Sequence, residues 1–365
     1  GGAVVLTADP SGLAEETTHF ATVTVGSLDA SVENQERILV GLHVTSAPAA
    51  SATQTLVARH LATSPTEPLV AASDGNGAVW LYNVFTGLPE RTFTAQGARL
   101  EGLLFSGDGR TLFALDSAST SVLAFDAQSG VQKASYPTGP LTGTELAGRP
   151  MAFVRPAGRP TLVAVGMAYD LESGSLLNVS QPILPGSVSL TVSPEPGALA
   201  NENGYVAWLT RPAFSEGSLE CHTMGGFGSG GYEAETCFSA SGDRLYSTSL
   251  VEGYEFVARS LSTREVVQHL PGEAYPNSMA SSWNGLVVGG SDDHYAEQDI
   301  WVYEGPSGTL LGRLSSSAAS GGYRDLLPMG LVLSADGTRV VSAWASHPAV
   351  YSSTGIAFQE LPALP

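Results

Sequence analysis

The sequence predicts an all-β fold, a β-propeller of four-stranded blades, on the basis of two recurring patterns and the composition. One pattern is a strand, a tight turn and a second strand. The other is an aromatic-bearing strand that ends in a Ser/Thr-Gly turn. The 365 residues include 42 glycines and 22 prolines, which suits many short strands joined by tight turns. Four short strands per repeat of roughly 40 to 50 residues are the content of one propeller blade.

The strand–turn–strand pattern occurs three times in clear form. It reads FSGDGRTLF at residues 105–113, FSASGDRLY at 238–246 and LSADGTRVV at 333–341. Asp-Gly and Ser-Gly pairs supply the positive φ that a tight hairpin needs. Looser copies lie around 153–162 and 283–287. We expect these hairpins to join the first and second strands of each blade.

The aromatic pattern gives the period. Its first copy reads WLY at residues 80–82 and ends at Gly87, and one copy is degenerate because Arg264 stands where the others have glycine. The seven closing positions are 87, 130, 174, 217, 264, 308 and 355, so the gaps between them are 43, 44, 43, 47, 44 and 47 residues. One complete unit predicts strands at 103–106, 111–116, 121–127 and 131–136.

The N-terminal segment has two interpretations. Counted from residue 52, the repeats give seven blades over 52–365, and residues 1–51 form a separate β segment before them. Residues 19–28 and 37–45 are long and alternating, which predicts strands. They fit a hairpin added to a seven-bladed ring. They also fit an irregular eighth blade, since 365 residues divided by eight is close to 46.

The repeats resemble the bacterial seven-bladed propellers called YVTN or WD40-like proteins. The shared features are the Ser-x-Asp-Gly-x-x-Leu-Tyr character of the hairpins and the aromatic residue followed by Ser/Thr-Gly on the third strands. The resemblance covers roughly residues 52–365. It implies a fold and no particular activity, because propellers carry many unrelated functions. The catalytic residues of lactonase-type propellers do not carry over.

The charge limits the classes of partner. The net charge is −19 although only 14% of residues are charged, and Lys133 is the only lysine. Such a field repels nucleic acid and anionic membranes, so neither is an expected partner. No run approaches 18 uninterrupted apolar residues, so no transmembrane segment is expected. The acidic, Ser/Thr-rich composition predicts a bacterial protein that is secreted, periplasmic or held at the cell surface.

The two cysteines flank a glycine-rich segment. Cys221 and Cys237 lie on either side of residues 222–231. In an exported protein we expect them to form a disulfide, worth roughly 3 kcal/mol for a loop of about 15 residues. The alternative is two unrelated buried thiols.

Motifs that specify chemistry are missing from the sequence. It contains no C-x-x-C-H, H-E-x-x-H, G-x-x-x-x-G-K-[ST] or G-x-S-x-G pattern. The densest polar cluster is Asp292, Asp293, His294, Glu297 and Asp299, and the hard oxygens of its four carboxylates make Ca²⁺ the one cofactor that the sequence suggests. A solvated acidic loop explains the same residues.

Loop placement favours one face of the ring. In a propeller, the loops between second and third strands and the crossings between blades share one face, here called the loop-rich face. The turns between first and second and between third and fourth strands share the other, here called the tight-turn face. Longer loops usually carry function, and tyrosines on them are good contact residues. The expected partner-binding residues are Tyr275, Tyr295, Tyr323, Asp74, Asp116 and His347.

Two functional hypotheses follow. The first is a non-enzymatic exported propeller that binds a protein or polysaccharide through its loop-rich face, as a binding or scaffold subunit of a cell-envelope or extracellular assembly. The second is a lactonase-like hydrolase or lyase with a metal held by carboxylates near the central axis. Its first candidate residues are Asp74, Asp116, Asp292 and His347, because all four fall in loops between second and third strands.

Overall fold

The computed structural model consists of β-strands and turns, and it has no helix in the residues it describes. This agrees with the short alternating segments of the sequence. No helix in the described ranges is long and apolar enough to cross a membrane. The structure describes residues 6–15, 17–25, 36–46, 52–54, 58–139, 149–155, 159–179, 189–192, 199–202, 206–215, 218–228, 235–249, 255–272, 275–291, 299–315, 324–346 and 355–364.

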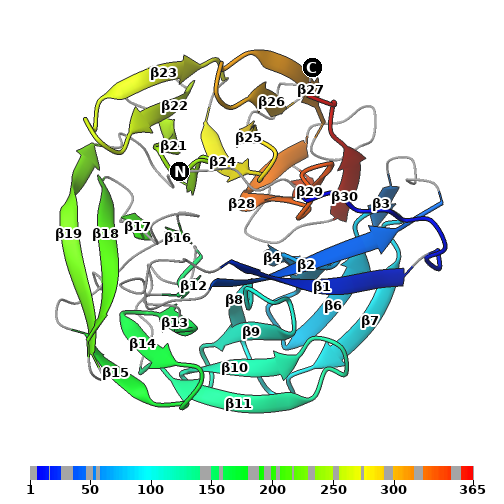
Figure 1. Cartoon of the computed structure of the whole chain (residues 1–365), viewed down its shortest axis with the longest axis vertical. Coiled ribbons are helices and arrows are strands. Elements are labelled where there is room, and N and C mark those ends of the chain that lie inside the picture. The colour runs from blue at the N-terminus through cyan, green and yellow to red at the C-terminus, as the bar shows by residue number, and fades with distance from the viewer. Residues whose placement is uncertain are drawn as a thin grey trace.

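Seven four-stranded sheets form a ring of blades, which confirms the predicted propeller (Figure 1). The innermost strands contact one another in chain order, and the last of them, β28, contacts the first, β4. The first three blades are β4 (His60–Thr63), β5 (Leu69–Ser73), β6 (Ala78–Asn83) and β7 (Pro89–Thr94); β8 (Leu100–Phe105), β9 (Thr111–Asp116), β10 (Ser121–Asp126) and β11 (Gln132–Pro137); and β12 (Met151–Val154), β13 (Thr161–Ala164), β14 (Met167–Asp170) and β15 (Leu176–Val179).

The remaining blades follow the same antiparallel order. The outer strands β15 and β19 also pair in parallel, so blades 3 and 4 share one sheet. Blades 4 to 7 are β16 (Ser189–Val192), β17 (Leu199–Glu202), β18 (Val206–Ser215) and β19 (Ser218–Gly228); β20 (Thr236–Phe238), β21 (Arg244–Ser249), β22 (Glu255–Ser260) and β23 (Val266–Leu270); β24 (Pro276–Ser281), β25 (Leu286–Ser291), β26 (Ile300–Glu304) and β27 (Leu310–Leu314); and β28 (Arg324–Leu333), β29 (Arg339–Ser346), β30 (Gly355–Glu360) and β3 (Ala52–Gln54).

The seventh blade closes the ring with a strand from the other end of the chain. β3 pairs antiparallel with β30, with Ala52 opposite Phe358 and Gln54 opposite Ile356. The sequence pattern placed Gly355 at the end of a third strand, whereas in the structure Gly355 begins that strand. The difference has a physical reason. The fourth strand comes from the N-terminal segment, so this blade needs no turn from its third strand into its fourth.

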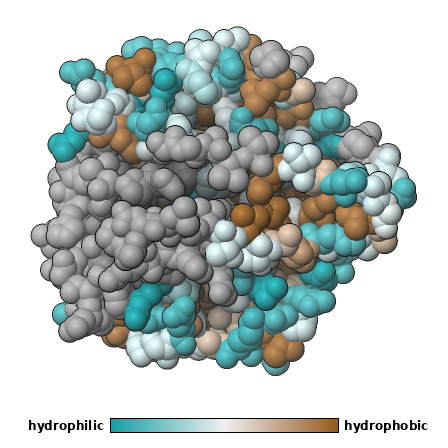
Figure 2. All heavy atoms as spheres, in the orientation of Figure 1, coloured by the Kyte–Doolittle hydropathy of each residue, from teal (hydrophilic) through white to brown (hydrophobic). Residues whose placement is uncertain are grey.

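The N-terminal segment also forms a hairpin outside the ring. β1 (Thr17–Val25) pairs with β2 (Glu36–Val44) and with no other described strand. Gly41 lies so close to the carbonyl of Thr66 that no side chain fits there, and the ring of His43 stacks on Phe85 at 5.9 Å. Thr66 and Phe85 belong to tight turns of blade 1, so the hairpin lies on the tight-turn face. Figure 1 shows it crossing this face toward the centre, and hydrophobic side chains gather over and beside it in Figure 2.

The blades pack through buried aliphatic and aromatic side chains, and tyrosines link neighbouring blades. Tyr169 on β14 donates its hydroxyl hydrogen to the carbonyl of Pro137 in the preceding blade. Tyr303 on β26 does the same to Pro271. In both cases a third strand is tied to the end of the fourth strand before it.

The strand–turn–strand pattern is explained by turn chemistry. Ser106 Oγ donates to Asp108 Oδ1 at 2.6 Å and accepts from the N–H of Thr111 at 3.0 Å. In blade 7, Ser334 Oγ donates to Asp336 Oδ1 at 2.5 Å. Ser-x-Asp-Gly is therefore a hairpin-closing motif.

The turn after the third strand is equally regular. In blade 2, Asp126 Oδ1 accepts from the N–H groups of Gln128 (3.1 Å) and Ser129 (2.9 Å), and Gly130 has a φ of 70°. In the degenerate copy, Arg264 adopts the same left-handed conformation with a φ of 66°. The repeat thus imposes a glycine conformation on an arginine.

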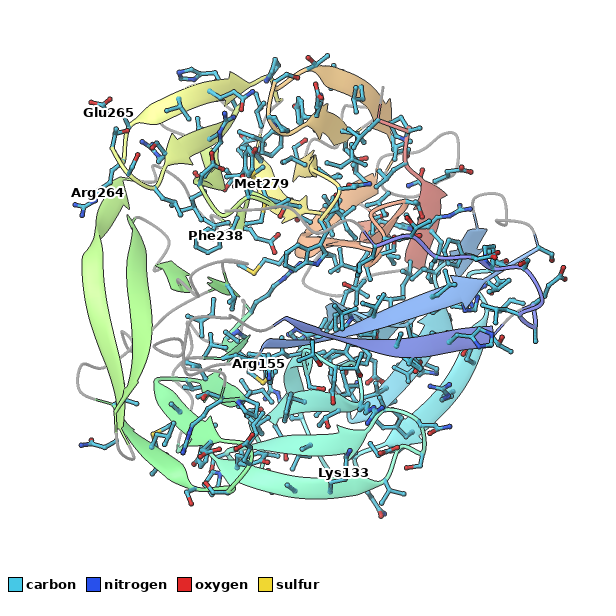
Figure 3. The ribbon with its side chains drawn as sticks, in the orientation of Figure 1. Lys133, Arg155, Phe238, Arg264, Glu265 and Met279 are labelled. Atoms are coloured by element: carbon cyan, nitrogen blue, oxygen red, sulfur yellow. The ribbon has the colours of Figure 1, made fainter. Side chains whose placement is uncertain are left out.

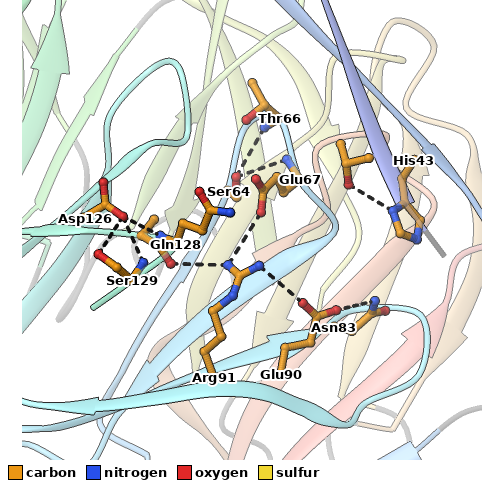
Figure 4. A network of polar contacts seen from close by, with 12 residues as sticks. His43, Ser64, Thr66, Glu67, Asn83, Glu90, Arg91, Asp126, Gln128 and Ser129 are labelled. Atoms are coloured by element: carbon orange, nitrogen blue, oxygen red, sulfur yellow. Dashed lines mark hydrogen bonds and ion pairs between the residues drawn. The ribbon is translucent and has the colours of Figure 1, made fainter. Parts of the chain in front are cut away.

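Arg91 on β7 ties this turn to blade 1 (Figure 4). Its Nη1 donates to the carbonyl of Ala127 at 3.3 Å and lies 3.8 Å from Glu67 Oε2. Its Nη2 lies 3.8 Å from Glu90 Oε2. Both glutamates belong to blade 1, as Arg91 does, and the contact with blade 2 is the hydrogen bond from Arg91 to Ala127.

Candidate functional site

The inner strands enclose a cavity of about 360 Å³, here called the axial cavity, near the tight-turn end of the ring. Its wall includes Thr63 at the end of β4, Val192 at the end of β16 and Leu333 at the end of β28. Ser239 and Trp283, in the first turns of blades 5 and 6, complete it. Because these turns lie on the tight-turn face, the cavity opens there. Its volume falls within the range of roughly 300 to 1,000 Å³ that small-ligand sites occupy.

Arg149 reaches this cavity from the other end of the ring, since it precedes the inner strand β12. Its Nη2 donates to the carbonyls of Met329 (3.2 Å) and Leu331 (2.8 Å) in blade 7. These carbonyls lie at an irregularity in β28, where Met329 has a φ of 54°. Its Nε lies 2.8 Å from Oε1 of Glu235 in blade 5. One guanidinium therefore joins three blades across the axis.

Glu235 holds the arginine without lining the cavity itself. The residue is 1% exposed, and its Oε2 accepts from the N–H of Met279 at 2.9 Å. Burial raises the pKa of Glu235 to about 7, although the Arg149 charge and the Met279 N–H act in the opposite direction. Glu235 is a positioning residue for the Arg149 guanidinium.

The rest of the wall combines a buried hydroxyl with apolar surface. Thr236 is 3% exposed, and its Oγ1 has no hydrogen-bond partner among the described residues. Phe238 and Met279 belong to this wall, whereas Arg155, on the opposite side of the view, does not line the cavity (Figure 3). Trp283, at the mouth, is 68% exposed. The site offers a charged donor and a hydroxyl inside and an aromatic surface at its entrance.

Three of the six predicted partner-binding residues are described, and none of them lines this cavity, whereas Cys237 of the predicted disulfide does. Tyr275 is 55% exposed on the loop-rich face and has a φ of 56°, which is a strained conformation for a bulky residue. Asp74 Oδ1 accepts from the N–H of Asn76 at 2.7 Å. Asp116 is buried and its Oδ1 accepts from the N–H of Arg99 at 2.8 Å. Both carboxylates accept hydrogen bonds from backbone N–H groups of loops on this face.

The other predicted contact and calcium residues are largely outside the described ranges. Asp299 is described, and it is buried just before β26. Calcium binding by its loop stays a prediction. The residues that lie outside the described ranges are Tyr295, Tyr323, His347, Asp292, Asp293 and Glu297.

The predicted disulfide gains no support from the strand order. Cys221 lies on β19, the outermost strand of blade 4, whereas Cys237 lies on β20, the innermost strand of blade 5. A disulfide needs Cα atoms within about 7 Å. Even neighbouring strands of one sheet are about 4.8 Å apart, so an outermost and an innermost strand are not the expected positions for a bonded pair. The side chain of Cys221 is outside the description. The bond stays a prediction.

Sequence reasoning missed the axial residues, although one signal was present. Residues 282–285 read Ser-Trp-Asn-Gly where blade 2 has Ser-Gly-Asp-Gly, so Trp283 replaces a small residue that the turn itself does not require. Arg149 and Glu235 each directly precede an inner strand. That position has no sequence signature, because it depends on how the blades meet at the axis.

Comparisons with known proteins leave the family open. A scan against protein-family models finds no match, and a search of curated proteins finds none. Within the described ranges, no three His, Cys, Asp or Glu side chains gather closely enough to hold a metal ion.

Proposed function

We propose that this chain is a non-enzymatic binding or scaffold protein that holds part of a partner in its axial cavity. The observation that carries the proposal is Trp283, a large aromatic side chain left exposed at the mouth of that cavity. Exposed aromatic residues beside a pocket are the usual anchors of binding sites. The turn closes through Ser282 and Gly285, so its geometry gives the tryptophan no structural task.

The biological setting of the proposal rests on composition. An acidic, Ser/Thr-rich chain with one lysine supports an exported bacterial protein, working as a subunit of a cell-envelope or extracellular assembly. A protein or polysaccharide partner suits an aromatic platform better than a nucleic acid does, given the net charge of −19. The repeat pattern also supports membership of the YVTN or WD40-like propellers.

The two faces of the ring give competing binding surfaces. Tyr275 supports the loop-rich face that the sequence favoured, whereas Trp283 and the axial cavity support the tight-turn face. Affinity capture from cell-envelope extracts with wild type, Trp283→Ala and Tyr275→Ala separates them. We expect the partner to be retained by Tyr275→Ala and lost by Trp283→Ala. The reverse pattern would return the binding site to the loop-rich face.

A hydrolase or lyase is the second candidate, and one observation favours it. A buried carboxyl group with a pKa raised to about 7 is typical of a general acid or base. Glu235 does not line the cavity, however, and both of its oxygens face protein groups. Turnover of a lactone panel that Glu235→Gln abolishes would establish the enzyme. Equal rates for wild type and Glu235→Gln would exclude this residue from such a role.

A further inference from the structure

We infer that the axial cavity binds a carboxylate carried on a short apolar group, an inference that rests on the proposed binding function. The carboxylate would lie against Arg149 and Thr236. The apolar group would extend along the wall toward Trp283. The arrangement of donors and apolar surface inside the cavity supports this ligand class.

The anion-binding end is built around an arginine that is held in place. The Nε and Nη2 atoms of Arg149 are engaged by Glu235 and by the carbonyls of blade 7. Its Nη1 makes no hydrogen bond or ion pair with any described residue, and 32% of the side chain is exposed. Two N–H donors are therefore left on a guanidinium whose orientation is already fixed. Both donors belong to Nη1, so a ligand carboxylate can accept a charge-assisted hydrogen bond from this nitrogen, which is stronger than a hydrogen bond between neutral groups.

Thr236 provides the second, independent contact. Two serine hydroxyls of the wall are used internally, since Ser281 Oγ donates to the carbonyl of Phe238 at 2.5 Å and Ser239 Oγ donates to Asp243 at 2.9 Å. Thr236 Oγ1 is buried in the same wall without a partner among the described residues. Buried hydroxyls are costly to leave unpaired. Thr236 and Arg149 line the same cavity, so we infer that one ligand carboxylate contacts both.

The remaining wall suits an uncharged, apolar body. Val192, Met279 and Leu333 contribute apolar surface, and Trp283 stands at the opening. Two sources share the required chemistry: the C-terminal end of a partner polypeptide and a free short-chain carboxylic acid. A volume of about 360 Å³ admits either.

Isothermal titration calorimetry with matched probes tests the inference. One pair is the peptide acetyl-Gly-Ser-Ala-Leu with a free carboxylate and the same peptide as its C-terminal amide. The other pair is 4-methylpentanoate and 4-methylpentanamide. The proteins are wild type, Arg149→Gln, Thr236→Val and the control Arg264→Gln, which removes a charge from the outer rim (Figure 3).

We expect each acid to bind roughly tenfold or more tightly than its amide. Arg149→Gln should abolish that preference, Thr236→Val should weaken acid binding severalfold, and Arg264→Gln should leave both unchanged. Tighter binding of the peptide acid identifies a chain end as the source, and tighter binding of 4-methylpentanoate identifies a free acid. If Arg149→Gln fails to fold, Thr236→Val carries the test, because it changes one hydroxyl to a methyl group.

Two results would overturn the inference. One is equal binding of acid and amide, or an acid preference that survives both cavity substitutions in folded protein. The other is that no probe binds at millimolar concentration. In either case the proposed function is judged separately, because partner capture by wild type and its loss in Trp283→Ala do not depend on the ligand class.

Discussion

Arg149 and Glu235 face each other across the propeller axis, with Nε and Oε1 2.8 Å apart, although one residue precedes blade 3 and the other precedes blade 5. Their relationship is unequal. Arg149 keeps partial contact with the cavity, whereas Glu235 is sealed off at 1% exposure. The pair therefore fixes the Arg149 guanidinium at the axis, while the Glu235 carboxylate that positions it stays buried. The desolvation of that carboxylate should be visible in the pH dependence of stability.

Glu235→Gln should change how the free energy of unfolding depends on pH. The pKa of Glu235 is raised from 4.5 to about 7, so between these values the folded protein holds a proton that the unfolded chain has lost. This contribution is fully present below pH 4.5 and is lost as pH rises through 7, by up to about 3 kcal/mol. Urea unfolding at pH 5 and pH 8 should show similar stabilities for both proteins at pH 5. At pH 8 we expect the glutamine variant to be the more stable. A variant that is less stable at pH 8 would show that the ion pair outweighs the burial of its carboxylate.

His60 should make the protein sensitive to acid. Burial, reinforced by the Arg59 charge, lowers the pKa of His60 from 6.5 to about 3. The unfolded chain therefore binds a proton below pH 6.5 that the folded protein excludes, and stability falls as pH falls. The loss is about 2 kcal/mol at pH 5. His60→Asn in the Glu235→Gln background, where the opposing carboxylate effect is absent, should flatten the unfolding free energy between pH 6.5 and pH 5. An unchanged slope would mean that His60 is protonated in the folded state.

The fold was predictable because each blade repeats its own turn chemistry. Ser106 with Asp108, and Asp126 with Gly130, are local contacts, so their spacing is visible in the chain. The strands of blade 2 agree with the predicted segments to within a few residues. Closure by β3 was not visible, because it joins two ends of the chain by backbone pairing that any alternating segment can make.

The candidate site was less predictable because its contacts join residues that are far apart in the sequence. Its residues meet at the axis from blades 1, 3, 4, 5, 6 and 7, and no local spacing in the sequence predicts that meeting. Sequence reasoning selected acidic residues in longer loops, but Asp116 accepts from backbone N–H groups of its own loop and of the crossing before β8. Trp283 was the exception, because it interrupts a repeated turn at a position where the fold needs no side chain.

Arg264→Gly should stabilise the protein. Arg264 has a φ of 66° and donates its N–H to the carbonyl of Ser260 at 2.8 Å, as Gly174 does to Asp170 with a φ of 71°. A left-handed conformation costs an L-residue roughly 1 to 2 kcal/mol, and glycine gives back roughly 0.5 to 1 kcal/mol through the unfolded chain. We expect a net gain of about 0.5 to 1 kcal/mol in urea unfolding.

Two substitutions control for the loss of charge and for packing. Arg264→Ala removes the charge but keeps the Cβ atom, so it should bring no gain. Gly174→Ala adds a Cβ atom where no other atom lies within 4 Å, so it reports backbone strain alone and should destabilise. Equal gains for Arg264→Ala and Arg264→Gly would assign the effect to charge.

Removal of β3 should open the ring, whereas removal of the β1–β2 hairpin alone should not. β3 supplies the fourth strand of blade 7 through pairing of Ala52, Thr53 and Gln54 with β30. The hairpin pairs with no other described strand and meets blade 1 through contacts such as that of His43 with Phe85. A chain that lacks residues 1–46 should therefore keep most of the unfolding free energy. A chain that lacks residues 1–54 should lose about 2 to 3 kcal/mol more, at about 1 kcal/mol for each lost backbone hydrogen bond.

A synthetic peptide of residues 47–58, added in excess, should restore the melting temperature of the shorter chain, because only strand pairing is missing. If both truncations melt alike and the peptide has no effect, the ring is held closed by contacts between inner strands, and β3 contributes no measurable stability.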